Sequence, residues 1–193
     1  KVEIICAVRK ELPQNFQRTA LSINRTKRKD DVFTLVMDGP HERAYFHTGK
    51  TLCPFDRPRG PGQCRDYAIK ASDADIVILV DGHMTFPLGW VDEICAHLAK
   101  HPKDITCCRM QGLGQDFTPL QENIYAGCFL MLKHPHPSMK NWFICSQWNK
   151  DAKEKGVTGG IMGACYGMKR SWYLEIGSPL AILEAWGGDE EIL

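Results

Sequence analysis

The chain has 193 residues, the length of one domain, and can bury a continuous core without disulfides or a structural metal. Hydrophobic residues make up 44% and charged residues 24%, an ordinary globular balance. The formal net charge of +1 argues neither for nor against a polyanionic partner. No apolar stretch reaches the roughly 18 residues that span a bilayer, so we expect no transmembrane segment.

Nine cysteines fall at irregular spacings, and several lie inside apolar runs. An odd number without a regular framework favours reduced, partly buried thiols over a disulfide scaffold. The sequence contains no Cys-x-x-Cys pair, which argues against a thiolate zinc site. Together with the lack of a signal-peptide pattern, this predicts a cytoplasmic protein. The first residue is a lysine, so we allow for a natural start further upstream.

The first third of the chain predicts two buried strands around a helix. Val2–Val8 is a short apolar run rich in β-branched residues, which is typical of a buried strand. Gln14–Asn24 carries apolar residues at helical spacing and predicts an amphipathic helix. Val32–Met37 predicts a second strand, ended by an Asp-Gly-Pro turn. Residues 39–63 show little periodicity and predict a long loop.

Helices and strands continue to alternate up to residue 108. Gln63–Ser72 predicts a helix, and Asp75–Val80 is the clearest buried strand in the sequence. Pro87 predicts the first turn of a helix over Leu88–Lys100, and Ile105–Cys108 predicts another strand. This alternation predicts an α/β fold with a mostly parallel central sheet.

The pattern is weaker from residue 109 onward. Small and apolar residues mix over Gly159–Met168, as in a backbone that passes close to another group. Ser171–Ile176 predicts a short helix that ends at Gly177.

Acidic residues follow two of the predicted strands, at the edge where parallel sheets bind ligands. Asp81, Gly82 and His83, hereafter the 81–83 turn, place a carboxylate and an imidazole two residues apart. Oxygen and nitrogen ligands suit Mn²⁺ better than Ca²⁺, and glycine allows unusual backbone angles in a turn. The alternative is that Asp81 caps the next helix. Asp38 is either a ligand of a base or ribose or part of an ordinary Asp-Gly turn.

Two further groups of polar residues have both structural and functional interpretations. Arg65 either forms surface ion pairs or orients a diphosphate or the aspartate at the strand end. The acids that follow Trp186, Asp189 and Glu190 among them, supply a general base or occupy the first turn of a helix.

These segments together resemble GT-A fold glycosyltransferases, especially the family 2 enzymes and the polypeptide N-acetylgalactosaminyltransferases. The D-x-H form of the 81–83 turn is the form found in the peptide transferases. Residues 109–157 fit the family pattern poorly. The segments that carry the resemblance are Ile4–Glu11, Val36–Gly39, Cys64–His83, Gly159–Gly177 and Trp186–Glu190.

The resemblance implies a Rossmann-like GT-A fold and a single glycosyltransferase domain. Residues 1–108 would form the nucleotide-sugar-binding half, and residues 109–193 the acceptor-side half, truncated or disordered at its C-terminus. The implied donor is a nucleotide diphosphate sugar, most readily a UDP-sugar, with Mn²⁺ or Mg²⁺ as the metal. The implied metal ligands are Asp81 and His83, and the implied catalytic acids are Asp189 and Glu190. The residues implied to bind the donor are Ala7, Arg9, Asp38, Arg65, Asp81, Gly159 and Gly160.

Two departures from the family pattern limit what the resemblance implies. Relatives with D-x-H use a third metal ligand, a histidine downstream of the W-G-G segment, which lies beyond the end of this sequence. The acid pair reads Asp189-Glu190 where relatives read Glu-Asp or Glu-Asn, so the sequence does not decide between inverting and retaining chemistry.

Two other functions compete with glycosyl transfer. A sugar nucleotidyltransferase shares the strand-end acids but needs a glycine-rich phosphate loop after the first strand, where this chain has Arg9 and Lys10. A non-catalytic nucleotide-sugar-binding module would keep the fold without turnover. The acceptor is open among protein, glycan, lipid, small-molecule and modified nucleic acid base.

Overall fold

A computed structural model describes residues 1–40, 45–125, 128–133, 143–148, 160–161 and 163–183. The elements in chain order are β1 Val2–Val8, α1 Pro13–Thr26, β2 Val32–Met37, β3 Lys50–Leu52, α2 Pro61–Ala71, β4 Ile76–Val80, α3 Trp90–Lys100, β5 Ile105–Cys107, β6 Met110–Leu113, β7 Pro119–Tyr125, β8 Cys128–Lys133, β9 Phe143–Trp148, β10 Cys165–Lys169, α4 Arg170–Glu175 and the short 3-10 helix η1 Pro179–Ile182.

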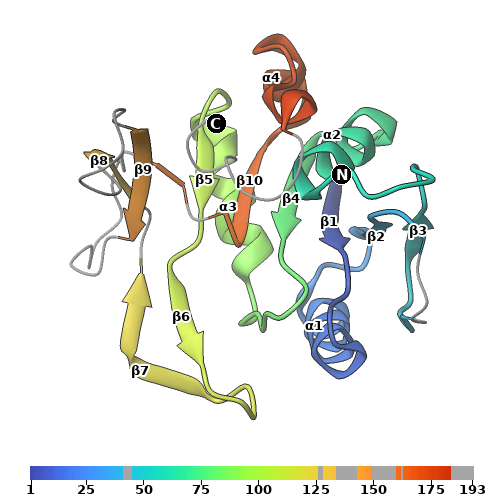
Figure 1. Cartoon of the computed structure of the whole chain (residues 1–193), viewed down its shortest axis with the longest axis vertical. Helices are drawn as coiled ribbons and strands as arrows, with labels where there is room; N and C mark the ends of the chain where they lie inside the picture. The colour runs from blue at the N-terminus through green and yellow to red at the C-terminus, as the bar shows by residue number, and fades with distance from the viewer. Residues whose placement is uncertain (41–44, 126–127, 134–142, 149–159, 162, 184–193) are drawn as a thin grey trace, which may run out of the picture.

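A six-stranded sheet in the order β3-β2-β1-β4-β10-β5 forms the centre of the fold (Figure 1). Strands β1 to β4 pair in parallel, whereas β10 runs antiparallel to both β4 and β5. Because β4 and β5 are both antiparallel to β10, they point in the same direction. The predicted mostly parallel α/β sheet is therefore confirmed.

Helices cover both faces of this sheet. Successive side chains of each strand point to opposite faces, so each strand contributes to the core on both sides. On β1, Ile4 and Cys6 pack in the core that contains Phe16 of α1 and Ile94 of α3. Ile5 faces the opposite core, which holds residues of α2, α4 and η1. All of these core residues are buried. Burial on both faces explains why the strands read as continuous apolar runs rather than as alternating ones.

The structure corrects the start of one predicted helix and adds two strands to the main sheet that the sequence did not predict. Helix α3 begins at Trp90 rather than at Leu88, because Gly89 adopts φ +85° in the left-handed region and interrupts the turn that Pro87 was expected to open. Strand β3 lies inside the predicted 39–63 loop, and β10 lies in the stretch read as irregular backbone.

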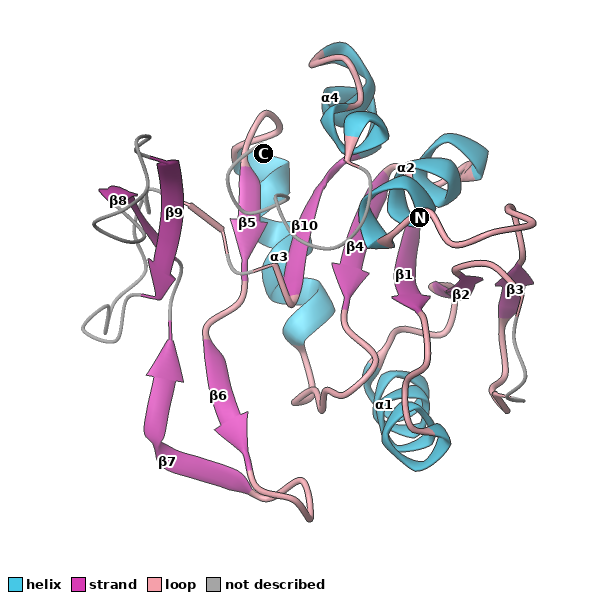
Figure 2. Cartoon of the chain, viewed as in Figure 1, coloured by secondary structure: helices cyan, strands magenta, loops and turns pink. Residues whose placement is uncertain are grey.

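Beyond residue 109 the chain forms antiparallel pairs on the β5 side of the main sheet (Figure 2). Strand β6 pairs with β7, and β8 pairs with β9. Among the described residues, no helix has the length and apolar character needed to cross a membrane. The cysteines whose side chains are described, from Cys6 to Cys165, are all free thiols.

Gly167 of β10 gives a direct test of the packing between the sheet and α3. A methyl group at this position would lie 2.9 Å from Cγ2 of Ile94 and 3.4 Å from Cγ1 of Ile78. We therefore expect Gly167→Ala to lower the free energy of unfolding by about 1–3 kcal/mol through overpacking. Urea denaturation measures this change.

The same contact predicts how a second substitution acts. Ile94→Ala alone should destabilise the protein by about 2–5 kcal/mol, because it leaves a cavity. In the double variant the new methyl group occupies part of that cavity, so the combined loss should be smaller than the sum of the two. Strict additivity would contradict a contact between β10 and α3 at this position.

Candidate functional site

Three parallel strands end at one edge of the sheet and carry the polar residues that the sequence singled out. Val8 of β1 lies opposite Met37 of β2, and Cys6 of β1 lies opposite Val80 of β4. The residues that follow these strands are therefore neighbours along the carboxyl edge. Ligands of parallel α/β sheets bind at this edge.

Asp81 follows β4 and is held by an arginine from α2. Its Oδ1 accepts a hydrogen bond from Nη2 of Arg65 at 2.9 Å. The Arg65 side chain is 4% exposed and that of Asp81 is 34% exposed, so the ion pair reaches from the protein interior to the edge of the sheet. Arg65 therefore does not form a surface ion pair but contacts the aspartate at the end of the strand, which is one of the roles that the sequence offered for it.

The Arg65 guanidinium also contacts β10 and the segment just before it. Nη1 donates to the Tyr166 hydroxyl at 3.4 Å, and Nη2 donates to the Gly163 carbonyl at 3.4 Å. The guanidinium carbon lies 5.5 Å from the centre of the Tyr166 ring. These partners replace part of the water that a buried guanidinium loses.

His83 is held by a residue from the segment between β1 and α1. Its Nδ1 lies 2.9 Å from Oε2 of Glu11. Burial raises the pKa of the Glu11 carboxyl, but hydrogen bonds from His83 and from the Leu12 amide outweigh it, and the pKa lies below its ordinary value. An ionised carboxylate only accepts, so Nδ1 is the donor and a neutral His83 keeps its lone pair on Nε2.

The structure changes the reason for the glycine in the 81–83 turn. Gly82 was expected to supply unusual backbone angles, but it is not among the glycines with positive φ. A Cβ at this position would instead lie 3.2 Å from Cγ of Glu11 and 3.2 Å from Cγ1 of Val8. The glycine thus gives the Glu11 and Val8 side chains room to approach the turn closely.

Asp38 follows β2 and is almost completely buried, with 2% exposure. Its carboxylate accepts hydrogen bonds from the backbone amides of Arg59 at 2.6 Å and Gly60 at 3.1 and 3.2 Å. These amides precede α2, where the helix dipole favours a negative charge. Burial, together with the charge of Asp38, also raises the pKa of the nearby Cys64 thiol.

The other predicted site residues divide into those at the edge and those outside the described part of the chain. Ala7 is partly buried near the end of β1, and Arg9 is exposed just after that strand. Gly160 is partly buried and precedes β10. Gly159, Asp189 and Glu190 lie outside the described residues.

The chemistry of the 81–83 turn fits a divalent metal. A carboxylate and an imidazole are ligands that Mn²⁺ accepts, and metal-binding histidines usually donate their other ring nitrogen to a carboxylate. His83 has such an arrangement with Glu11. Within the described part of the chain, no group of three or more histidine, cysteine or acidic side chains is arranged to hold a metal. The turn therefore offers two candidate ligands, Asp81 and His83, and a metal held there would complete its shell from the donor, from water or from other residues.

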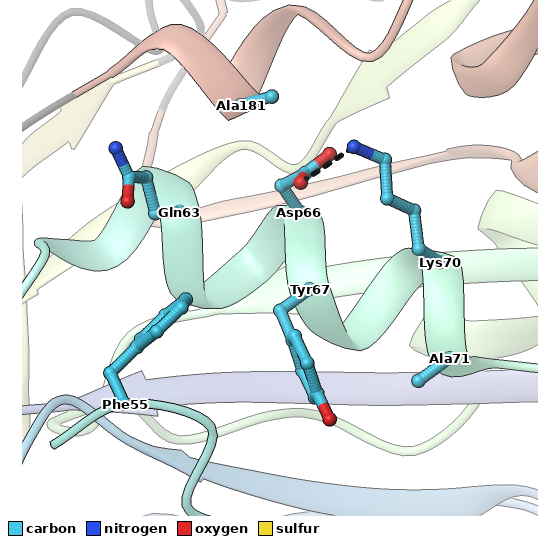
Figure 3. Close-up of a pocket in the computed structure, with 7 residues that line it drawn as sticks. All are labelled: Phe55, Gln63, Asp66, Tyr67, Lys70, Ala71 and Ala181. Atoms are coloured by element: carbon cyan, nitrogen blue, oxygen red, sulfur yellow. Dashed lines mark hydrogen bonds and ion pairs between the residues drawn. The ribbon is translucent and has the colours of Figure 1, made fainter.

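A surface groove lies along α2, and its lining includes none of the strand-end residues. The groove, of about 450 Å³, follows the outer face of α2, lined by Phe55, Tyr67 and Lys70 among others (Figure 3). Its carboxylate, Asp66, binds Lys70 at 2.9 Å and accepts a hydrogen bond from Tyr173 at 2.8 Å. None of the predicted site residues lines the groove. The bonds of Asp66 join residues of α2 and α4 and have a structural role. We therefore place the candidate site at the edge of the sheet and not in this groove.

Glu11 is the residue at this edge to which sequence analysis gave no role. Its position three residues after β1 is a usable signal, because Asp38 and Asp81 also follow strands that end at the same edge. Its partner could not be predicted, because the contact joins residues 72 positions apart in sequence.

Comparisons with solved structures give the same fold. The structure of GalNAc-T7 with UDP, GalNAc and Mn²⁺ matches with a TM-score of 0.65 at 15% identity, over 98% of this chain and 39% of that one. A Pyrobaculum calidifontis mannosyltransferase in complex with GDP-Man and Mn²⁺ matches with a TM-score of 0.54 at 11% identity, over 91% and 46%. S. aureus TarS 1–349 matches with a TM-score of 0.50 at 15% identity, over 67% and 41%.

The chain thus spans less than half the length of these three proteins. A search of curated proteins finds no significant match. The sequence model described as glycosyl transferase family 2, however, matches residues 4–177, which include the main sheet except for the first two residues of β1. The chain therefore belongs to glycosyl transferase family 2 and carries a glycosyltransferase domain of GT-A fold.

Proposed function

We propose that this chain transfers a sugar from a nucleotide diphosphate sugar, in the first place a UDP-sugar, to an acceptor hydroxyl. The observation that carries the proposal is the 81–83 turn at the end of β4. Both candidate metal ligands there are held by a second side chain, Asp81 by Arg65 and His83 by Glu11. Such outer contacts are typical of ligands that must keep one orientation.

Asp81 and His83 would hold Mn²⁺ or Mg²⁺ beside the diphosphate. The metal, when bound, neutralises charge on the leaving nucleoside diphosphate. Arg65 keeps the Asp81 carboxylate at the edge and adds positive charge behind it. Glu11 orients the imidazole so that Nε2 is available as the ligand atom.

The remaining predicted residues would surround the donor and the acceptor. Ala7, Arg9 and Asp38 lie at or next to the ends of β1 and β2 and would line the nucleotide. Gly159 and Gly160 would let the backbone approach the transferred sugar. The acceptor hydroxyl would face Asp189 and Glu190, one of which would act as general base.

The ligands of two structural relatives support the donor class and the metal. GalNAc-T7 was solved with UDP and Mn²⁺, and the mannosyltransferase with GDP-Man and Mn²⁺. We propose a nucleotide-binding half over residues 1–108 and an acceptor-side half over residues 109–193. The free thiols support a reducing, cytoplasmic location.

Replacing Asp81 tests the metal site. Asp81→Asn keeps the side-chain shape but removes the charge that binds the metal. We expect Mn²⁺-stimulated hydrolysis or transfer from UDP-sugars to fall by on the order of 100-fold or more, because a bound metal supplies several kcal/mol of transition-state stabilisation. Turnover of a panel of nucleotide sugars, with Mn²⁺ and with EDTA, measures the effect.

Asp104→Asn is the matched control. Asp104 is a half-exposed carboxylate, paired with His97, that precedes β5 at the opposite edge of the sheet. This variant should keep wild-type turnover. Unchanged metal-stimulated turnover in Asp81→Asn would refute the site assignment. Binding without any turnover in the wild type would indicate a binding module, and release of pyrophosphate from a nucleoside triphosphate would indicate a nucleotidyltransferase.

Asp38 allows its structural role and its proposed nucleotide contact to be separated. Asp38→Ala removes the acceptor of the Arg59 and Gly60 amides, so we expect the free energy of unfolding to fall by about 1–2 kcal/mol. The affinity for UDP should fall as well. Urea denaturation and isothermal titration with UDP measure the two effects.

Asp31 provides a control at the other end of β2. Its buried carboxylate accepts hydrogen bonds from the backbone and side chain of Arg28, so Asp31→Ala removes a comparable set of contacts. This variant should lose stability and keep its UDP affinity. Equal UDP affinities in the two variants would leave Asp38 a purely structural role.

A further inference from the structure

One face of α1 carries three hydroxyls that bind the segment after β4. Thr19, Ser22 and Thr26 are spaced three and four residues apart, so they lie on one side of the helix. The Phe86 amide donates to the Ser22 hydroxyl at 2.8 Å. The indole nitrogen of Trp90 donates to the Thr26 hydroxyl at 3.0 Å. These contacts attach the chain between β4 and α3 to the helix.

Thr19 binds this segment on both sides of His83. Its single hydroxyl hydrogen is shared between the Gly82 carbonyl at 3.0 Å and the Asn15 carbonyl at 3.2 Å, and its oxygen accepts a hydrogen bond from the Met84 amide at 2.8 Å. Thr19 is fully buried, and Met84 is 6% exposed. Water therefore does not compete for these bonds, and the backbone flanking His83 is fixed relative to α1.

Part of this arrangement has an ordinary explanation. Helical threonines often donate to the carbonyl four residues earlier, and Thr19 has the Asn15 carbonyl at 3.2 Å. Thr26 has the same bond, to the Ser22 carbonyl at 2.8 Å. The bond to the Asn15 carbonyl does not explain why the same hydroxyl also contacts the Gly82 carbonyl and the Met84 amide, which lie on either side of His83.

Glu11, two residues before the same helix, completes the contact. One carboxylate oxygen accepts from the Leu12 amide at 3.0 Å and from Asn15 Nδ2 at 3.3 Å, both at the start of α1. The other oxygen binds the His83 ring. The segment that leads into α1 thus holds the imidazole, and Thr19 of α1 holds the backbone on either side of it.

We propose that Thr19 is a positioning residue, which keeps the His83 imidazole in the orientation that a divalent metal at the 81–83 turn requires. The inference rests on the proposed function, because it assumes that this turn binds the metal. Thr19 itself touches neither metal nor donor. Its hydroxyl acts through the Gly82 carbonyl and the Met84 amide.

Thr19→Val tests the proposal, because valine has nearly the same shape and lacks the hydroxyl. We expect the Mn²⁺ concentration for half-saturation to rise by about 10–100-fold, the usual effect of removing an outer contact of a metal ligand. Electron paramagnetic resonance of free Mn²⁺ measures binding of the metal alone. Affinity for UDP without metal should not change, and Thr19→Ser should restore Mn²⁺ binding.

Thr26→Val is the matched control on the same helix. It removes a partly buried hydroxyl that accepts a hydrogen bond from the Trp90 indole, which lies seven residues after His83. It should lower thermal stability and leave Mn²⁺ binding unchanged. An equal change in Mn²⁺ binding in both variants, or no change in Thr19→Val, would overturn the proposal.

Two further variants separate the possible failures. Asp81→Asn should abolish the Mn²⁺ signal, and if it does not, the metal site itself is wrong and the role of Thr19 is refuted with it. If Asp81→Asn removes the signal while Thr19→Val does not weaken it, only the positioning role fails. Should Thr19→Val not fold, Thr19→Ala removes the same hydroxyl and should weaken Mn²⁺ binding by about 10-fold or more, and unchanged Mn²⁺ binding in that variant would overturn the proposal.

Discussion

A buried guanidinium imposes the strictest requirement on this fold. Arg65 enters the layer between α2 and the sheet, where it has lost most of its water and must find protein acceptors. Those acceptors come from the end of β4, from the Tyr166 hydroxyl and from the Gly163 carbonyl. Helix α2, β4 and the entry to β10 must therefore meet at one point. The place where they meet is the edge that carries the 81–83 turn.

The 81–83 turn is supported from both layers of helices. Arg65 approaches Asp81 from the α2 side, whereas Glu11 and Thr19 approach His83 from the α1 side. Each candidate ligand thus has its own support, on opposite faces of the sheet. A displacement of one helix would move one ligand relative to the other, so the distance between the two ligands depends on the packing of the whole three-layer core.

Continuous apolar runs and helical spacing made the first half of this structure predictable. Val2–Val8 and Ile76–Val80 form continuous apolar runs because both of their faces are covered, and Asp38 and Asp81, which follow β2 and β4, mark the ligand edge. Strand β10 escaped prediction because Gly167 leaves room for Ile94, and a glycine at such a position resembles irregular backbone in sequence. Side-chain partners such as Glu11 and His83 were not predictable, because nothing local specifies a contact between distant segments.

The contacts of α1 with the 81–83 turn have a consequence for how the protein acquires its site. The bonds of Thr19 to Gly82 and Met84, and of Glu11 to His83, join residues 63, 65 and 72 positions apart. Contacts of such long sequence separation carry a loop-closure cost that contacts between neighbouring residues do not have. Local segments cannot assemble this site, and a cation bound there would add its binding free energy to the stability of the folded domain as a whole. Metal affinity would then report on global folding as much as on two side chains.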